Sequence, residues 1–363
     1  MNSDRRRITI ADVARQAAVS PATAGRALGD YGYVREEIRT RVQEAAKLLG
    51  YRPNGLARSM ATGRTNTIGV VGADIGNPFF ASAMRGIGDV ARAEGFGTIL
   101  TNSDEDVVIE REAVKLLLEK QVDGIIVSPA DVGDSQHLHE AIESGTPVIL
   151  FDRVIGELAA DAVLTDSVTA TKNAVSHLLA LGHRRIAIVA ELRASMDSSW
   201  PIWLSQRDAL DPERLNPSGS RLLGYIQAHE AADVPIDPDL IRATGAYSRV
   251  SACEQTRALL ALPNAPSAIF TADNVMTVGA LDAIQQSGLR IPQDISFVAY
   301  DDMDWMTFVT PAISAVAQPV YEMGQVAAQM LLERMEKPNA SIKRKVLKTK
   351  FVRRQSCARL GRK

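Results

Sequence analysis

A short segment near the N-terminus carries side chains suited to reading DNA. Ser20 and Pro21 can begin a helix, and Pro21, Ala22 and Arg26 would then lie on its exposed face. A guanidinium group suits the acceptor edge of guanine, and a methyl side chain suits the methyl group of thymine. The segment therefore predicts base contacts in a major groove. The alternative is a small helical subdomain with Arg26 in solvent.

The sequence offers little for catalysis. Gly86-Ile87-Gly88-Asp89-Val90-Ala91 matches a dinucleotide-binding fingerprint, but it lies inside a predicted helix rather than directly after a strand, which indicates a chance match. The sequence contains no phosphate-binding P-loop and no nucleophile elbow, and its five histidines lack zinc-ligand spacing. His183, after Gly182 at a helix end, is interpreted as capping or packing. We expect no catalytic residue, no metal site and no cofactor.

Composition limits the protein class. With 363 residues and 46% hydrophobic residues, the chain can form about two or three packed domains. Its two cysteines, Cys253 and Cys357, are too few for a disulfide scaffold and favour a reducing compartment. No export signal and no apolar run of about 18 residues is present. We expect a cytoplasmic protein without a membrane partner.

Charge is divided unevenly along the chain. Residues 1–66 contain 12 Lys and Arg against 6 Asp and Glu, whereas the remainder contains 29 against 37. A basic head on an acidic body is typical of a nucleic-acid-binding module attached to a second functional unit. The alternative is a solvated charged face.

Three short helices are predicted in the basic head. The first follows Thr9, which with Asp12 resembles a capping box. The second runs from Pro21 to about Leu28 and the third from Arg35 to Leu49, where Gly50 ends it. The brief turn at Ala18 and Val19 makes the first two a helix-turn-helix.

A segment of weak helical potential follows the head. Pro53 can start a helix, but a helix of about eight residues that contains Gly55 is too short to persist alone. We expect it to fold on DNA, where Met60 would wedge into the minor groove. An ordinary linker is the alternative.

The acidic body alternates strands and helices. Nearly continuous apolar strands are predicted at 67–72, 98–101, 124–127, 148–151, 186–190, 268–271 and 296–300, and helices at 80–94, 110–120 and 136–144. This order predicts two doubly wound lobes with parallel sheets, which bind ligands at the carboxyl ends of their strands.

A series of short motifs is spread over nearly the whole chain. They are Ile10-Ala11-Asp12-Val13-Ala14, Val19-Ser20-Pro21-Ala22-Thr23, Ala57-Arg58-Ser59-Met60, Asn77-Pro78-Phe79-Phe80, Val122-Asp123-Gly124-Ile125-Ile126, Phe151-Asp152-Arg153, Gly182-His183-Arg184-Arg185-Ile186, Ile291-Pro292-Gln293-Asp294-Ile295-Ser296 and Thr310-Pro311. In order and spacing, these motifs resemble the lactose-repressor (LacI/GalR) family of bacterial transcription regulators.

The resemblance implies an all-α helix-turn-helix head, a hinge helix and an α/β core like that of the periplasmic binding proteins. The corresponding ranges are 1–52 for the head, 53–63 for the hinge and 64–363 for the core. The first lobe of the core would comprise about 64–165 and 319–340, and the second lobe about 166–318 and 341–363.

The family pattern also implies two sets of site residues. The DNA-binding set is Thr9, Ser20, Pro21, Ala22, Thr23, Arg26, Asn54, Leu56, Ala57, Arg58 and Met60. The effector-binding set, suited to a sugar, is Asn77, Phe79, Phe80, Asp152, Arg153, Arg221, Tyr247, Asp273, Asp301 and Gln318. Local alternatives are that Phe80 belongs to the core, that Asp301 caps the next element and that Asp152 pairs with Arg153.

The chain departs from the family pattern at several points. Ala24-Gly25 replaces the usual Val-Ser, Met60 replaces a leucine, and Asp273-Asn274 reverses the usual Asn-Asp order. The segment 192–220, with Trp200 and Trp203, is longer than the family pattern, and its role as a lid, an interface or a loop stays open.

Assembly and mechanism follow from this architecture. A single head reads half a site, so we expect a homodimer on a near-palindromic operator, without the leucine heptads of a tetramer in the tail from Lys343 to Lys363. An effector between the lobes would change operator affinity, as inducer or corepressor. The alternatives are a periplasmic sugar-binding protein, which would need an export signal, and a sugar-modifying enzyme, which would need a catalytic motif.

Overall fold

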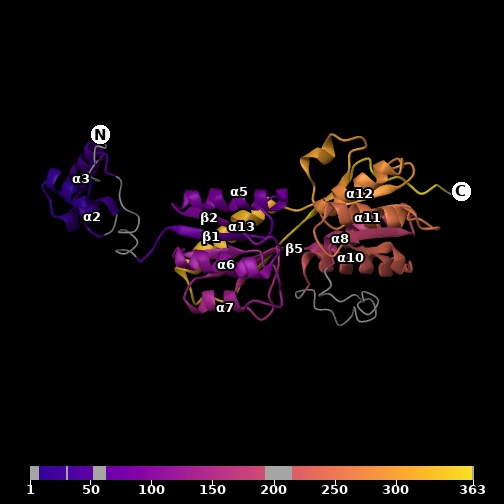
Figure 1. The fold of residues 1–363 in the computed structure, drawn as a ribbon, viewed down its shortest axis with the longest axis horizontal. Helices are drawn as coiled ribbons and strands as arrows, with labels where there is room; N and C mark the ends of the chain where they lie inside the picture. The colour runs from indigo at the N-terminus through magenta and orange to yellow at the C-terminus, as the bar shows by residue number, and fades with distance from the viewer. Residues whose placement is uncertain (1–7, 30–31, 52–62, 193–214, 362–363) are drawn as a thin grey trace, which may run out of the picture.

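The computed structural model describes residues 8–29, 32–51, 63–192 and 215–361 (Figure 1). The expectations for the hinge at 53–62 and for most of 192–220, including Trp200 and Trp203, lie outside these residues. The described helices do not combine the length and the apolar composition that crossing a membrane requires.

Three helices form the head: α1 (Ile10–Gln16), α2 (Pro21–Gly29) and α3 (Glu36–Leu49). Their buried faces are built from small apolar residues, among them Val13, Ala24 and Val42, which are fully buried. Ala18 connects α1 to α2 with a φ of 49°, a left-handed conformation that lets the chain change direction between Gln16 and Pro21. The predicted helix-turn-helix and third helix are therefore confirmed.

The first lobe is a six-stranded parallel sheet in the order β11-β5-β4-β3-β1-β2. Its strands are β1 (Thr67–Gly72), β2 (Gly97–Asn102), β3 (Gly124–Val127), β4 (Val148–Phe151), β5 (Asp161–Thr165) and β11 (Arg344–Leu347). The helices α5 (Pro78–Ala93) and α13 (Val320–Glu336) pack on one face, and α6 (Val107–Glu119) and α7 (Gln136–Glu143) on the other.

The second lobe repeats this plan in the order β12-β10-β9-β8-β6-β7, with only β12 antiparallel. Its strands are β6 (Ile186–Ala190), β7 (Ile241–Ala243), β8 (Ala268–Thr271), β9 (Ser296–Tyr300), β10 (Ser314–Ala317) and β12 (Lys350–Val352). Its helices are α8 (Ser167–Ala180) and α10 (Pro217–Ala231) on one face, and α11 (Arg249–Leu260) and α12 (Asn274–Gln286) on the other, with 3₁₀ turns at Pro238–Leu240 and Asp304–Thr307.

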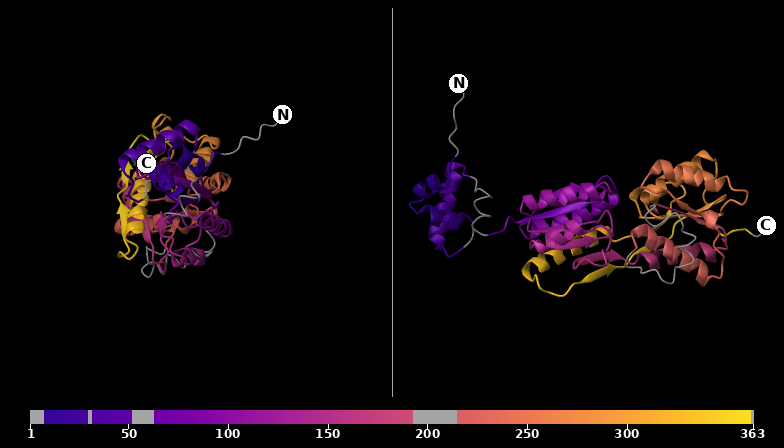
Figure 2. Two further views of the ribbon diagram at one scale, coloured as in Figure 1. Left: turned by 90° about the vertical axis from the view of Figure 1, so that its left-hand side faces the viewer. Right: turned by 60° about the horizontal axis from the view of Figure 1, so that its bottom comes forward.

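The chain crosses between the lobes three times. It crosses after β5 at Asp166, after β10 at Gln318 and Pro319, and between β11 and β12. Figure 2 shows the C-terminal part of the chain, in yellow, running along both lobes. The assignment of 341–363 entirely to the second lobe is wrong, because β11 pairs with β5 in the first sheet. This strand covers an edge of β5 that would otherwise expose unpaired backbone groups.

The first glycine of the fingerprint-like run, Gly86, has a packing role. Gly86 lies in the middle of α5, where an added Cβ would come within 2.1 Å of the Tyr321 carbonyl oxygen on α13. Gly324 on α13 meets the Ala83 carbonyl of α5 in the same way, at 2.2 Å. The two helices therefore touch backbone to backbone, which accounts for Gly86 in the fingerprint-like run; at Gly88 an added Cβ would meet no atom within 4 Å.

Packing also explains His183. One ring nitrogen lies 2.8 Å from the Ser267 hydroxyl, and the other lies 3.1 Å from the Ala358 carbonyl. Its side chain is 2% exposed and ties the C-terminal segment to the second sheet. The interpretation of His183 as a packing residue is confirmed.

Candidate functional site

The second helix of the head presents one face to solvent. Pro21, Ala22 and Arg26 are exposed on α2, whereas Ala24 and Ala27 on its opposite face are buried in the head. Arg26 therefore has the exposure that a base contact requires, and Gly25 lies at the edge of the buried face. The geometry matches a helix laid into a groove by its N-terminal half.

Hydroxyl groups surround the start of this helix. The Thr23 amide donates to the Ser20 hydroxyl at 3.1 Å, and the two side-chain hydroxyls are 2.9 Å apart. At α1, the Thr9 amide and hydroxyl both donate to Asp12, at 3.0 and 2.8 Å. Exposed hydroxyls at a helix N-terminus are well placed for phosphate oxygens, since the helix dipole favours anions there.

Other predicted DNA-binding residues cannot be placed in the same way. Asn54, Leu56, Ala57, Arg58 and Met60 lie outside the described residues.

A cavity of about 460 Å³ lies between the two lobes. This volume is within the range of small-molecule sites. The cavity is bounded by side chains that follow parallel strands of both sheets, so the carboxyl ends of the two sheets face each other across it. Nine of the ten predicted effector residues line it: Asn77, Phe79, Phe80, Asp152, Arg153, Arg221, Tyr247, Asp273 and Asp301.

Gln318 is the exception, because it lies behind the wall of the cavity. Its amide nitrogen donates to Asp301 at 2.7 Å, and its amide oxygen accepts from the Thr165 hydroxyl at 2.9 Å. It therefore links a cavity residue to two of the chain crossings. As a ligand-contacting residue, Gln318 stays a prediction.

Aromatic rings form the apolar part of the wall. Phe79 meets Phe80 edge to face at 5.1 Å and lies 6.1 Å from Phe151. Phe79 and Phe80 are each 6% exposed and pack into the core of the first lobe while lining the cavity. The suggestion that Phe80 is a core residue is therefore compatible with a place in the wall.

Arg153 is held by two fixed acceptors. Its guanidinium group makes a two-pronged ion pair with Glu105, at 2.6 and 2.7 Å, and donates to the Pro129 carbonyl at 2.5 Å. The suggestion that Asp152 pairs with Arg153 is wrong, because the Arg153 guanidinium group forms its ion pair with Glu105. Glu105 has a φ of 59° in the turn after β2.

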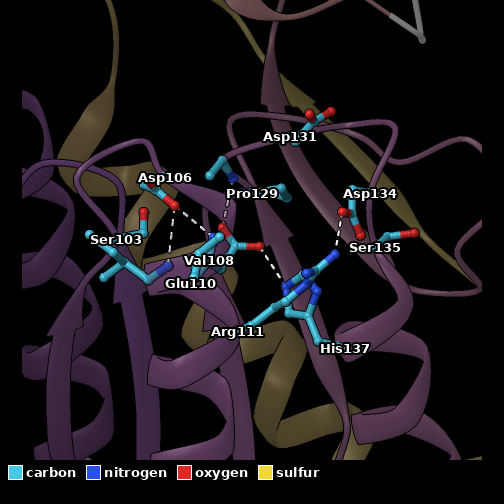
Figure 3. A network of polar contacts seen from close by, with 12 residues as sticks. Ser103, Asp106, Val108, Glu110, Arg111, Pro129, Asp131, Asp134, Ser135 and His137 are labelled. Atoms are coloured by element: carbon cyan, nitrogen blue, oxygen red, sulfur yellow. Dashed lines mark hydrogen bonds and ion pairs between the residues drawn. The ribbon is translucent and has the colours of Figure 1, made fainter.

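A buried carboxylate positions the loop that carries Pro129, as Figure 3 shows. Glu110 is fully buried; its carboxylate accepts from the Ala130 amide at 2.6 Å and lies 2.7 Å from Nε2 of His137. Through Pro129, this network fixes the acceptor that Arg153 uses. The sequence analysis missed Glu110 because nothing in its local pattern distinguishes it from an exposed helical glutamate.

Arg221 occupies the inner part of the second lobe's wall. It lies on α10, which begins at Pro217 and is capped by Asn216. Its guanidinium carbon lies 4.0 Å from the centre of the Tyr300 ring, and it donates to the Ala272 carbonyl at 2.5 Å. Its Nε has no hydrogen-bond partner among the residues that the structure describes.

Three carboxyl groups face this guanidinium group. Asp152 and Asp301 follow β4 and β9 and adopt φ values of 64° and 67°, at corresponding positions of the two lobes. Such strained conformations in non-glycine residues gather at functional sites. Asp273 caps α12, since its Oδ1 accepts from the amides of Val275 and Met276 at 2.8 and 2.9 Å.

Burial changes the acidity of two of these groups. It raises the pKa of Asp152 to about 6, against the opposing effect of Arg221 and Arg153. It raises the pKa of Asp273 to about 7, although the Met276 amide and Arg221 favour the charged form. The suggestion that Asp301 caps the next element is wrong, because the 3₁₀ turn at Asp304–Thr307 has no side-chain cap; Asp301 instead accepts from the Asn274 amide at the start of α12, at 3.3 Å.

One hydrogen bond joins the lobes at the rim of the cavity. The Asn274 side-chain amide donates to Oδ1 of Asn77 at 2.6 Å, and the same oxygen accepts from the Phe79 amide at 3.0 Å. The reversed Asp273-Asn274 pair therefore places a carboxylate at the cavity wall and an amide at the contact between lobes.

The cavity also contains residues that the sequence analysis did not select. They are Asp74, Asp104, Glu105, Asp106, Pro217, Gly245 and Ala246. The acidic run 104–106 directly follows β2, so the rule that ligands bind at strand ends could have identified it.

Comparisons with known proteins agree with both parts of the chain. A model of bacterial regulatory proteins of the lacI family matches residues 9–54, and a periplasmic binding protein-like domain matches residues 175–357. Catabolite control protein A of Priestia megaterium is 33% identical over 91% of this chain and 93% of its own length.

Two solved structures extend the similarity to three dimensions. The lac repressor dimer bound to operator and the anti-inducer ONPF is 25% identical, covers 97% of this chain and all of its own, and gives a TM-score of 0.80. A LacI family regulator from Enterococcus faecium with bound ribose is 30% identical over 81% of this chain and all of its own, with a TM-score of 0.68.

The raised pKa of Asp273 predicts how replacing it changes stability. Between its usual value of 3.8 and about 7, the folded protein holds a proton that the unfolded chain releases, so wild-type stability falls as pH rises. Asp273→Asn keeps an oxygen that can cap α12, and it removes the fall in stability with rising pH. Its stability advantage should grow between pH 4 and 7 and then level off, by up to about 4 kcal/mol at about 1.4 kcal/mol per pKa unit.

Thermal unfolding of both proteins from pH 4 to 8 measures this difference. Glu254→Gln, at an exposed position on α11, serves as the control and should follow the wild type. Parallel pH profiles for Asp273→Asn and wild type would contradict the assignment of a raised pKa.

Proposed function

Since the chain belongs to the lacI family of bacterial regulatory proteins, we propose that it is a repressor whose operator affinity is controlled by a small polyhydroxylated effector. It is a DNA-binding transcription regulator and not an enzyme. The proposal rests on one observation: a cavity bounded by both lobes, on a chain that carries an exposed recognition helix in a separate head.

The head supports a reading of operator DNA by α2. Arg26 and Ala22 face solvent together, and the Ser20 and Thr23 hydroxyls lie at the helix N-terminus. In this arrangement the hydroxyls hold phosphates and fix the register, while Arg26 discriminates between bases. Because one head covers half a site, a pair of heads related by a two-fold axis would read a near-palindromic operator.

The cavity supports control by a ligand that bridges the lobes. Phe79 would cover an apolar face of the effector, and Tyr247 would face it from the other lobe. Asp152, Arg221 and Asp301 offer the acceptors and donors that hydroxyl groups require, since an unpaired buried hydroxyl is costly. A ligand held from both sides favours one relative orientation of the lobes.

Hydrogen bonds connect the cavity wall to the chain crossings. Asp301 accepts from Gln318, which accepts from Thr165, and the Thr165 hydroxyl lies 3.1 Å from that of Ser167. The Tyr300 hydroxyl donates to Ser167 at 3.2 Å. An effector that binds Asp301 or displaces Arg221 from Tyr300 therefore acts on residues at two crossings, which supports coupling between binding and lobe orientation.

Exposed apolar side chains support a homodimer. In the first lobe they lie on or beside β2 and α6, and in the second lobe on α11, which packs next to β7. The strands β2 and β7 are the corresponding edge strands of the two sheets. Exposed apolar side chains on neighbouring elements of one edge favour association with a second copy. The side chains are Ile75, Leu100, Val108, Ile109, Leu116 and Val250, exposed by 39 to 68%.

Arg26→Ala tests the reading of bases. Loss of a guanine contact should reduce the preference for operator over unrelated DNA by about 1–3 kcal/mol, or roughly 5- to 150-fold. Fluorescence anisotropy with the operator selected from a random duplex library measures this preference. Arg257→Ala, at an exposed position on α11, should keep it. Unchanged selectivity in Arg26→Ala would refute the assignment of α2 to the groove.

Arg221→Ala tests control by the effector. A library of sugars, screened by thermal shift, provides the effector, and release of operator in its presence measures the response. Removing a charged donor should weaken effector binding by about 10- to 100-fold and raise the concentration needed for the response equally. Operator binding without effector should persist, and a wild-type response in this variant would refute the cavity as the effector site.

Leu116→Glu tests the dimer surface. A charge buried against a second copy is unfavourable, so the dimer should dissociate at micromolar concentration in sedimentation velocity runs. Val346→Glu, on β11 at the opposite edge of the same sheet, is the matched control and should stay dimeric. A dimer of unchanged stability in Leu116→Glu would place the interface elsewhere.

A further inference from the structure

The charge of the cavity points to the chemical class of its ligand, and this inference rests on the proposed function. Seven carboxyl groups line the cavity against two guanidinium groups. Four of the seven have partners within the first lobe. Glu105 pairs with Arg153, Asp74 and Asp106 accept backbone amides, and Asp104 accepts from Asn102.

The other three carboxyl groups share a single cation. Asp152, Asp273 and Asp301 surround Arg221, which makes no ion pair within 4 Å in the described part of the chain. The charges of Asp152 and Asp301 still stabilise that of Arg221. Above pH 7, where Asp273 with its raised pKa is ionised as well, this inner group carries two negative charges in excess.

Asp273 has an unused acceptor in this group. Asp273 is 3% exposed, and its Oδ1 accepts the two backbone amides that it caps at the start of α12. Its Oδ2 is buried and has no hydrogen-bond partner among the residues described. A buried carboxylate oxygen without a partner is unfavourable. A ligand that donates to this oxygen removes the penalty, and a charged donor does so more strongly than a neutral one.

Excess negative charge also selects against a class of ligands. A phosphate or carboxylate group in the cavity would meet three carboxyl groups and one guanidinium group, because Arg153 is already neutralised by Glu105. Like charges at short range are repelled by several kcal/mol, according to general measurements on interfaces. The cavity therefore disfavours phosphorylated and acidic sugars.

We propose that the effector is a polyol that carries one basic nitrogen, an amino sugar or imino sugar, with its ammonium group against Asp273 and its hydroxyl groups on Asp152, Arg221 and Asp301. Phe79 covers the carbon skeleton from the first lobe. The ammonium group supplies the charged donor that Oδ2 lacks and halves the excess charge. In Asp273→Asn, Oδ1 still caps α12 while the new amide no longer attracts a cation.

Calorimetric titration of the full chain with matched probes tests this. Each set contains a basic sugar, a neutral counterpart and the phosphate of that neutral sugar: glucosamine, glucose and glucose 6-phosphate; galactosamine, galactose and galactose 6-phosphate; 1,4-dideoxy-1,4-imino-D-ribitol, in which nitrogen replaces the ring oxygen, ribose and ribose 5-phosphate. At least one amine should bind tenfold or more tightly than its counterpart, and no phosphate should bind more tightly than either. A panel without such a preference, including one in which the tightest ligand is neutral or anionic, overturns the proposal.

Variants test the position of the ammonium group. Asp273→Asn should reduce the preference for the amine at least tenfold, towards parity with the neutral counterpart. Glu254→Gln removes one exposed charge from the same lobe and should keep the preference. If Asp273→Asn keeps it, the ammonium group binds elsewhere and the proposal is wrong.

Operator binding separates this inference from the proposed function. An amine that binds at Asp273 but leaves operator affinity unchanged supports the ligand class and refutes control of DNA binding by this cavity. A neutral or phosphorylated sugar that changes operator affinity through the cavity supports the proposed function and refutes the ligand class.

Discussion

Charged groups buried between two sheets are the constraint on which the rest of this structure depends. Parallel strands of both lobes end at the same cavity, and their last residues bring Asp152, Asp273 and Asp301 close to Arg221. Burial raises the pKa of Asp152 and of Asp273, because their charged forms are incompletely compensated. The protein therefore holds a site whose polar groups are incompletely paired.

The scaffold around this site is closely packed within a lobe, whereas the two lobes are joined by three crossings of the chain. In the first lobe, α5 and α13 touch backbone to backbone at Gly86 and Gly324, which leaves little room for sliding. Between the lobes run three crossings, and hydrogen bonds of Gln318 and Thr165 join two of them to Asp301. Changes at the cavity thus concentrate at the crossings, where few contacts resist them.

Local sequence was enough to predict elements whose signals are strong. The buried strands β1, β3, β4, β6, β8 and β9 were predicted with their observed bounds, because each is a short apolar run covered on both faces. Five strands were missed: the edge strands β7, β11 and β12 are brief or exposed, and the apolar runs of β5 and β10 are only three residues long between polar neighbours. Pairing with β5, not local preference, makes Arg344–Leu347 a strand.

The sequence by itself determined the helix-turn-helix head and the two-lobed α/β core, because these depend on periodicity, caps and strand ends that are local in the chain, and its resemblance to the lacI family identified most of the cavity wall. Tertiary structure decided the partners. In the folded protein Arg153 pairs with Glu105, Gln318 donates to Asp301 from behind the cavity wall, and Oδ2 of Asp273 has no donor among the described residues. Those outcomes depend on which groups from distant segments meet in a medium of low polarity, where each unpaired charge or hydrogen bond counts most.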